Sequence, residues 1–280
     1  MKTIGIVGAG LMGTDLALYT AEKGFTVLLH DVGEEPLRHS LDTIRERLHH
    51  YETLGRFDHP KADEILTSIQ PYNKLEGLSP SDIVIECVTE DLGIKMEVFH
   101  KLDSICKAGA ILASNTSSKS ITAIASATHR PESVIGMHFM NPIRAMKLVE
   151  IICGLATTRE TFQMAKQLVK TLGKEYVESR DFPGFLTNRI LMPMLNEAIF
   201  AFYEGAGTVE AIDKAMTLGM NQPMGPLALA DLIGLDVVLA VIEELYRGFG
   251  DSKYRPCPLL KKYVAAGYLG KKSGRGFYVY

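Results

Sequence analysis

The sequence predicts an α/β fold in which a doubly wound, mostly parallel sheet precedes a second, all-helical domain. Three observations predict it. In the first half of the chain, short apolar runs alternate with amphipathic helical segments, the order that builds a parallel sheet. Two closely linked apolar runs follow, over 134–140 and 148–152, and so short a link favours an antiparallel pair. The remainder is helical in pattern almost to its end, so we expect domains at 1–182 and 183–280.

The N-terminal segment predicts the strand–helix–strand unit from which such a sheet starts. Residues 2–7 form an apolar run with β-branched side chains, as in a buried strand. The segment 11–22 predicts a helix that ends at Gly24, because glycine favours the backbone conformation found at helix C-termini. A second apolar run over 26–30 ends at Asp31. This order is typical of a Rossmann-like, dinucleotide-binding domain.

A G-x-G-x-x-G motif lies between this first strand and helix. Gly8 permits the tight turn, Gly10 lets the backbone approach a pyrophosphate, and Gly13 lets helix and strand pack closely. The helix N-terminus offers N–H groups and a partial positive charge to the same anion. Asp31 can accept hydrogen bonds from the adenosine ribose and would repel a 2′-phosphate, so we expect NAD rather than NADP. The predicted cofactor contacts are Gly8, Gly10, Leu11, Met12, Gly13 and Asp31.

The other elements follow from the same patterns. In the first domain, helices are predicted over 34–53, 63–69, 92–106, 119–126 and 159–172. Further strands are predicted over 70–73, 82–88, 111–113 and 175–178. In the second domain, helices are predicted over 185–203, 208–217, 226–233, 236–248 and 258–266. The loops 8–13, 89–95 and 114–118 follow strands, so they should share the sheet edge at which ligands gather.

The composition excludes several classes of protein. The 280 residues include 30 basic and 33 acidic side chains, well mixed, and no basic tract suggests a nucleic-acid partner. No apolar run approaches the length of a membrane span, and we expect no signal peptide because the first strand begins at once. The cysteines form no C-x-x-C motif; they are Cys87, Cys106, Cys153 and Cys257. We therefore expect buried thiols in a reducing, cytoplasmic compartment and no metal site.

His138 is the first candidate for acid–base chemistry. It lies near the end of one predicted strand, and Glu150 lies on the next. If the two strands pair, an imidazole N–H can donate to the carboxylate, which fixes the tautomer and stabilises an imidazolium during proton transfer. The alternatives are a packed, hydrogen-bonded histidine and a buried structural glutamate.

Three further groups have both a structural and a functional interpretation. Asn188, one turn into an apolar helix, either caps neighbouring backbone or holds a substrate oxygen. Ser117 caps the helix over 119–126, contacts a ligand, or does both. A basic group on and just past the helix over 34–53 is either a solvated face or a landing site for a phosphorylated ligand. It comprises Arg38, Arg45, Arg47, His49, His50 and Arg56.

Several short motifs, in order, cover essentially the whole chain. They are GAGLMG with Asp31, SNTSS at 114–118, HFMNP at 138–142, MKLVE at 146–150 and PGFLTNR at 183–189. PMGP at 223–226, ADL at 230–232 and KSGRGFY at 272–278 extend the set. With these motifs the sequence resembles the short-chain L-3-hydroxyacyl-CoA dehydrogenases, and most of all the bacterial 3-hydroxybutyryl-CoA dehydrogenases.

The resemblance implies that NAD oxidises the 3-hydroxyl of an L-3-hydroxyacyl-CoA, and that the reverse reaction reduces acetoacetyl-CoA. It implies that His138 exchanges the substrate proton and that Glu150 orients His138. Ser117 and Asn188 would hold substrate oxygens, and Arg56 would contact the CoA part of the substrate. The implied cofactor contacts are Glu90, Lys95, Ser117, Asn141 and Lys272, with a solvated surface role as the alternative for the two lysines. A homodimer through the helical domain is also implied.

This chain departs from the family pattern at a few positions. Met140 and Lys119 replace a usual phenylalanine and leucine, and Arg144 stands where small or apolar residues are usual. Arginines and histidines replace the usual lysines over 47–56. A gulonate-type sugar acid or a carrier-protein-bound hydroxyacyl group is therefore the alternative substrate. A dinucleotide-binding protein without enzymatic activity is a third hypothesis, and the presence of His138 opposes it.

Overall fold

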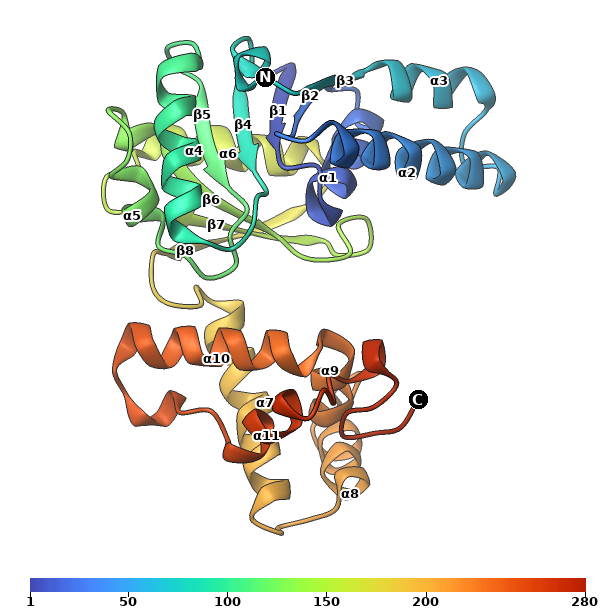
Figure 1. Ribbon diagram of the computed structural model, residues 1–280, viewed down its shortest axis with the longest axis vertical. Helices are drawn as coiled ribbons and strands as arrows, with labels where there is room; N and C mark the ends of the chain where they lie inside the picture. Colours follow the sequence, from blue (N-terminus) through green and yellow to red (C-terminus); the bar gives the residue numbers. More distant parts are fainter. The chain divides into compact units, whose positions relative to one another are not determined.

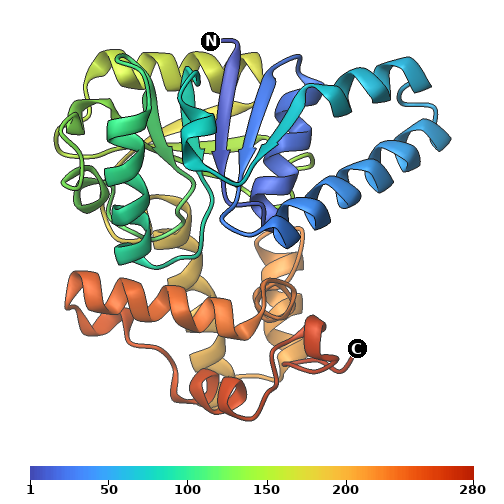
Figure 2. The same ribbon diagram turned by 45° about the horizontal axis from the view of Figure 1, so that its top comes forward.

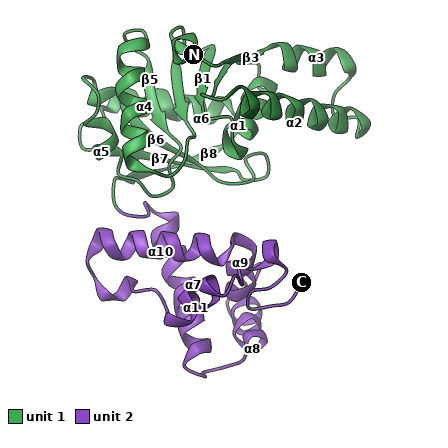
Figure 3. Cartoon of the chain, viewed as in Figure 1, with its two compact units in different colours: residues 1–182 green, residues 183–280 purple.

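The structure, a computed structural model, describes residues 1–280 (Figure 1). The chain forms two compact units, Met1–Phe182 and Pro183–Tyr280 (Figure 3). The division falls at the residue where the change from alternating to helical sequence placed the predicted boundary. None of the helices combines the length and the apolar character that crossing a bilayer requires.

An eight-stranded sheet forms the centre of the first unit (Figure 1). In spatial order its strands are β3 (Ile69–Tyr72), β2 (Thr26–His30), β1 (Thr3–Val7), β4 (Ile83–Glu86), β5 (Ile111–Ser114), β6 (Val134–Phe139), β7 (Leu148–Cys153) and β8 (Glu175–Arg180). Every neighbouring pair is parallel except β6 and β7, which are antiparallel. The predicted doubly wound sheet, with one antiparallel pair after the alternating region, is confirmed.

Helices flank this sheet. They are α1 (Leu11–Glu22), α2 (Glu34–Thr53), α3 (His59–Thr67), α4 (Leu92–Ile105), α5 (Ile121–Ala125) and α6 (Arg159–Thr171). Aliphatic side chains of the strands and of the facing helices form one core, in which Ile4, Ile6 and Leu16 are fully buried. The pair α2 and α3 extends outward past the β3 edge of the sheet (Figures 1 and 2).

Two of these helices begin away from their predicted starts, because a polar residue caps each of them at another position. Asp58 accepts a first-turn N–H at 3.1 Å, so α3 starts before the predicted range 63–69. Ser120 accepts a first-turn N–H at 3.1 Å, so α5 starts inside the predicted range 119–126. The alternative in which Ser117 caps this helix is therefore wrong.

The second unit is helical. Its helices are α7 (Thr187–Tyr203), α8 (Val209–Lys214), α9 (Pro226–Ile233), α10 (Leu235–Phe249) and α11 (Pro258–Ala265). The helix predicted over 208–217 continues past α8 as a π-helical turn, Ala215–Gly219. The inner face of α7 contributes buried residues such as Leu195 to the core of this unit, whereas Ile190 is 71% exposed. The apolar surface of α7 is thus larger than this chain buries.

Candidate active site

The loops that follow β1, β4 and β5 lie at one edge of the sheet. In the parallel register Val7 lies beside Glu86, and Glu86 lies beside Ser114, so the three strands end at the same level. The next residues continue the ladder: the N–H of Cys87 donates to the Val7 carbonyl at 2.7 Å, and that of Asn115 to the Glu86 carbonyl at 2.8 Å. The predicted gathering of these loops is therefore present.

The glycine loop after β1 has the geometry that a bound pyrophosphate requires. Gly8 has φ +101°, a conformation that L side chains rarely adopt, and a Cβ at Gly13 would collide with the Gly8 carbonyl oxygen. A Cβ at Gly10, by contrast, would meet nothing within 4 Å, so space lies open beside the N-terminus of α1. No side chain caps that N-terminus, which leaves its N–H groups to an anion.

Asp31 connects the glycine loop to the end of β2. Its Oδ2 accepts the Ala9 N–H at 2.8 Å, and its Oδ1 accepts the Gly33 N–H at 3.1 Å. These bonds fix the carboxylate beside the glycine loop, and each oxygen retains lone-pair capacity for a ribose hydroxyl. The residues present therefore fit a dinucleotide. Burial lowers the pKa of the preceding His30, whose Nδ1 lies 3.0 Å from the Tyr72 carbonyl oxygen, so this histidine packs within the fold.

The Glu90 carboxylate joins the β4 loop to the SNTSS loop. Its Oε1 accepts the backbone N–H groups of Ser117 and Ser118 at 3.0 and 3.1 Å, together with the hydroxyl of Thr116. Its Oε2 lies 3.1 Å from the Nζ of Lys95. Burial opposes ionisation of this carboxyl group, but the Lys95 charge and these donors hold the pKa of Glu90 below its usual value. Glu90 thus holds Ser117 in place as an anion.

Lys95 is buried, so the alternative of a solvated surface lysine is wrong at this position. The residue is 1% exposed, and its Nζ lies 2.8 Å from Glu86 Oε1 and 3.4 Å from the Val88 carbonyl oxygen. Burial alone would lower the pKa of Lys95, but the charges of Glu86 and Glu90 raise it above its usual value. Glu86 was not among the predicted site residues; it also accepts the Ser114 hydroxyl at 2.6 Å. Its signal was a carboxylate that ends an otherwise apolar strand.

Replacing Lys95 by methionine should lower the free energy of unfolding by about 3–5 kcal/mol near pH 7, because two carboxylates lose their buried partner. The raised pKa of Lys95 means that its contribution is present below about pH 10 and is lost above it. The lowered pKa of Glu90 means that its contribution is present above about pH 4 and is lost below it.

Urea unfolding of the wild type and of Lys95→Met between pH 3.5 and 9 measures this difference, with the exposed Lys101→Met on the same helix as the control. The destabilisation should shrink as Glu90 becomes protonated. A difference of equal size at every pH would contradict the role of Glu90 in this network.

His138 and Glu150 lie directly opposite each other on the antiparallel strands β6 and β7. The Nδ1 of His138 lies 2.8 Å from Oε2 of Glu150. The Glu150 side chain is fully buried, and 12% of the His138 side chain is exposed. Because a carboxylate accepts, Nδ1 carries the hydrogen in this pair and the basic lone pair resides on Nε2. The contact expected between His138 and Glu150 if their strands pair is therefore present.

Asn115 supports this histidine from the neighbouring loop. Its Oδ1 accepts the N–H of Phe139 at 2.9 Å, which ties the SNTSS loop to the end of β6, one residue past His138. Asn115 belongs to the SNTSS motif but was not a predicted site residue; the signal for it was an amide side chain directly after a buried strand. Asn141 follows β6 at the same edge.

A pocket of about 530 Å³ lies between α1, α2 and the connection from β6 to β7. It is lined by Arg47 and Arg56 of the predicted basic group and by Arg144. The guanidinium carbons of Arg56 and Arg144 lie 5.1 and 4.4 Å from the centroid of the Tyr51 ring. Arg47 and Arg144 also pair with carboxylates of α1, Asp15 and Glu22 respectively. Arg38 and Arg45 line a different pocket beside the end of β3.

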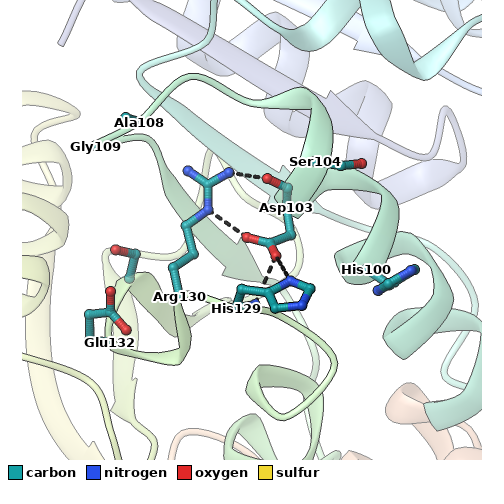
Figure 4. Close-up of a pocket in the computed structure, with 9 residues that line it drawn as sticks. His100, Asp103, Ser104, Ala108, Gly109, His129, Arg130 and Glu132 are labelled. Atoms are coloured by element: carbon teal, nitrogen blue, oxygen red, sulfur yellow. Dashed lines mark hydrogen bonds and ion pairs between the residues drawn. The ribbon is translucent and has the colours of Figure 1, made fainter.

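A second large pocket, of about 580 Å³, contains none of the predicted site residues (Figure 4). Gly109 and Arg130 of its lining lie just before β5 and β6, at the amino ends of these strands and away from the loops described above. Arg130 donates to the Asp103 carboxylate at 2.7 Å and to the carbonyls of Lys107 and Cys106 at 2.9 and 3.0 Å. Arg130 therefore caps the C-terminal end of α4, so its charge stabilises the fold.

In the second unit, the structure places the remaining predicted residues on separate elements. Asn188 lies in the first turn of α7. Lys272 lies on a short 3-10 turn and its Nζ donates to Asp236 at 2.7 Å. The ADL motif holds the KSGRGFY motif, because the buried Asp231 accepts the N–H of Phe277 at 3.0 Å.

Comparisons with known proteins agree with this geometry. Residues 3–182 match the family model "3-hydroxyacyl-CoA dehydrogenase, NAD binding domain", and residues 184–280 match the model of the C-terminal domain of the same enzymes. The chain belongs to the 3-hydroxyacyl-CoA dehydrogenase family. The resemblance drawn from the motifs is confirmed, and the first unit is the NAD-binding domain of a dehydrogenase of this family.

Individual members of the 3-hydroxyacyl-CoA dehydrogenase family are similar along their whole length. The 3-hydroxybutyryl-CoA dehydrogenase of Bradyrhizobium diazoefficiens is 49% identical over 100% of this chain and 96% of its own. That of Clostridioides difficile is 46% identical over 99% of each chain. The crystal structure of (S)-3-hydroxybutyryl-CoA dehydrogenase PaaH1 from Ralstonia eutropha matches with a TM-score of 0.96 and 44% identity, over 100% of this chain and 99% of that one.

Proposed function

We propose that this enzyme interconverts (S)-3-hydroxybutyryl-CoA and acetoacetyl-CoA with NAD(H). The observation that carries the proposal is the His138–Glu150 pair, with 2.8 Å between Nδ1 and Oε2, at the end of β6 beside the dinucleotide loops. The names of the similar proteins support the substrate, since they are 3-hydroxybutyryl-CoA dehydrogenases.

In the oxidative direction, Nε2 of His138 takes the proton of the substrate 3-hydroxyl as the C3–H bond breaks. NAD supplies the hydride acceptor when it is bound. The resulting imidazolium lies against the Glu150 carboxylate, which is fully buried and offsets the positive charge. In the reductive direction the imidazolium returns this proton to the C3 oxygen.

Ser117 and Asn188 complete the proposed catalytic set by hydrogen-bonding the substrate oxygens, which would hold C3 at a distance suited to hydride transfer. Support for Ser117 comes from its position in the loop that Glu90 fixes. The proposed cofactor contacts are Gly8, Gly10, Leu11, Met12, Gly13, Asp31, Glu90, Lys95, Ser117, Asn141 and Lys272. Lys95 contributes to the cofactor site by keeping the Glu90 carboxylate ionised.

The pocket lined by arginines supports a CoA thioester over a small sugar acid. Arg56, the predicted substrate contact, lines it with Arg47 and Arg144, and guanidinium groups suit phosphate oxygens. A sugar acid carries one carboxylate and no phosphate, so it offers fewer acceptor groups to these guanidinium groups than the CoA part of a thioester does. No observation favours the carrier-bound alternative.

We also propose that the protein forms a homodimer and resides in a reducing, cytoplasmic compartment. Homodimerisation through the second unit is supported by apolar side chains that the single chain leaves exposed, among them Ile190 and Leu218, at 71% and 75%. A reducing, cytoplasmic setting is supported by the four cysteines, all of which are free thiols.

The test of the proposed function mixes the purified protein with acetoacetyl-CoA and follows NADH oxidation. NADPH and free acetoacetate are parallel controls. Rapid oxidation of NADH with the CoA ester alone is the expected result. Measurable NADH binding without turnover of the ester would overturn the substrate assignment, and turnover of free acetoacetate at a similar rate would remove the role of the arginine pocket.

Replacing Asp31 by alanine should narrow the preference for NADH over NADPH by about tenfold or more, because the variant loses both a ribose acceptor and the charge that repels a 2′-phosphate. The ratio of kcat/KM for the two cofactors measures the effect. Asp42→Ala, an exposed carboxylate on α2, is the control. An unchanged ratio in a folded Asp31→Ala variant would count against the ribose contact.

A further inference from the structure

Lys174 is a buried cation that the proposed chemistry does not use. The residue is 5% exposed and lies directly before β8. Buried lysines are rare unless a partner compensates their charge, and here the partners of the ammonium are carbonyl oxygens and a ring rather than a carboxylate. Its Nζ donates to the carbonyl of Ile143 at 2.5 Å and to that of Met146 at 2.6 Å, and it lies 4.4 Å from the centroid of the Tyr19 ring.

The sheet register brings Lys174 next to the connection from β6 to β7. Leu148 pairs with Glu175, and the Glu175 N–H donates to the Lys147 carbonyl at 2.9 Å, so the residue before β8 lies next to the residues that precede β7. The two carbonyls that accept from Lys174 belong to residues 142–147 of that connection. Ile143 is 1% exposed, so water cannot replace the ammonium as the partner of its carbonyl group.

The surroundings of Lys174 are fixed as well. Tyr19 of α1 donates its hydroxyl to the Leu172 carbonyl at 2.8 Å, which holds the ring against the ammonium. Burial, followed by the nearby positive charges of Lys23 and Arg144, lowers the pKa of Lys174. Desolvation and two like charges both oppose a cation at this position. We therefore expect its hydrogen bonds to have a specific role.

We propose that Lys174 is a positioning residue for the proposed cofactor contact Asn141. By binding the carbonyls of Ile143 and Met146, Lys174 fixes residues 142–147, and this in turn fixes the position of Asn141. Asn141 lies in the same connection, directly before residue 142 and just after β6, the strand of His138. The inference rests on the cofactor contact proposed for Asn141. Lys174 itself touches neither substrate nor cofactor in this assignment, and it acts through the backbone that it holds.

The test measures the NADH dissociation constant by fluorescence for four proteins: the wild type, Lys174→Met, Asn141→Ala and the double variant. Lys174→Met keeps the aliphatic stem but removes every donor, and we expect it to weaken NADH binding roughly tenfold. Because Lys174 acts through Asn141, the loss in the double variant should be clearly smaller than the product of the two single losses. Lys170→Met, an exposed lysine at the end of α6, is the matched control and should bind NADH as the wild type does.

A multiplicative loss in the double variant would overturn the proposal, as would wild-type NADH binding in a folded Lys174→Met protein that shows only a lower melting temperature. If Lys174→Met does not fold, Lys174→Gln replaces it, since its shorter amide cannot reach both carbonyls; wild-type binding in that variant overturns the proposal too. Wild-type NADH binding in Asn141→Ala would also overturn the proposal, because Lys174 could then not act through Asn141. The dehydrogenase activity is tested separately by the acetoacetyl-CoA assay.

Discussion

His138→Ala should lower kcat for acetoacetyl-CoA reduction by about 10²–10⁴-fold, the range expected for loss of a positioned general acid. In the wild type the proton leaves Nε2 of an imidazolium whose Nδ1 is held 2.8 Å from a buried carboxylate, and alanine offers no group that carries a proton. NADH binding should survive, because the glycine loop and Asp31 follow β1 and β2, which β4 and β5 separate from the strand of His138. Steady-state kinetics and NADH titration of the same preparation separate the two effects.

The control for His138 is His100→Ala, an exposed histidine on α4. It should leave kcat and NADH affinity unchanged. A His138→Ala protein that binds NADH and retains more than roughly a tenth of wild-type turnover would identify another group as the proton donor.

Glu150→Gln should lower kcat by about 10²–10⁴-fold although it changes the shape of the side chain very little. A neutral amide can present its N–H to the imidazole and so favour the wrong tautomer, and it cannot offset the charge of an imidazolium; a comparable exchange in the histidine–aspartate pair of serine proteases costs about 10⁴-fold. The loss should appear in kcat rather than in NADH affinity.

Glu178→Gln on the adjacent strand β8 is the matched control, because its carboxylate is 48% exposed and pairs with Arg159 at the surface. It should leave both kcat and NADH affinity unchanged. If Glu150→Gln were as active as Glu178→Gln, Glu150 would be a structural partner of His138 without a share in proton transfer. A variant that is merely less stable would melt earlier while its kcat at low temperature stayed normal.

Much of the fold was predictable because it depends on local patterns. The glycine loop, α1 and the acid at the end of β2 lie close together in the sequence. The positive φ of Gly8 is a conformation that glycine adopts readily, so the residue type alone predicts it. The start of α3 was less predictable, because a single side chain, Asp58, decided it. The cap of α5 by Ser120 rather than Ser117 shows the same limit, since both residues are serines in a polar stretch.

By itself, the sequence determined the doubly wound sheet, the helical second unit, the family and the identity of the acid–base candidates. Periodicity, turn residues and ordered motifs are properties of neighbouring residues, and they can be recognised without knowing which distant segments meet. His138 and Glu150 were candidates on these grounds, and the short connection between their strands made the pairing foreseeable.

Only the tertiary structure decided which charges are buried and what compensates them. Lys95 and Lys174 are ordinary polar residues in the sequence, yet one lies between two carboxylates and the other beneath a backbone connection. Glu90 became the anchor of the SNTSS loop because parallel strands bring residues 26 to 28 positions away to one edge. Such partners are set by strand order and register, which depend on the packing of the whole unit, and the cost of burying a charge is fixed only once that packing is complete.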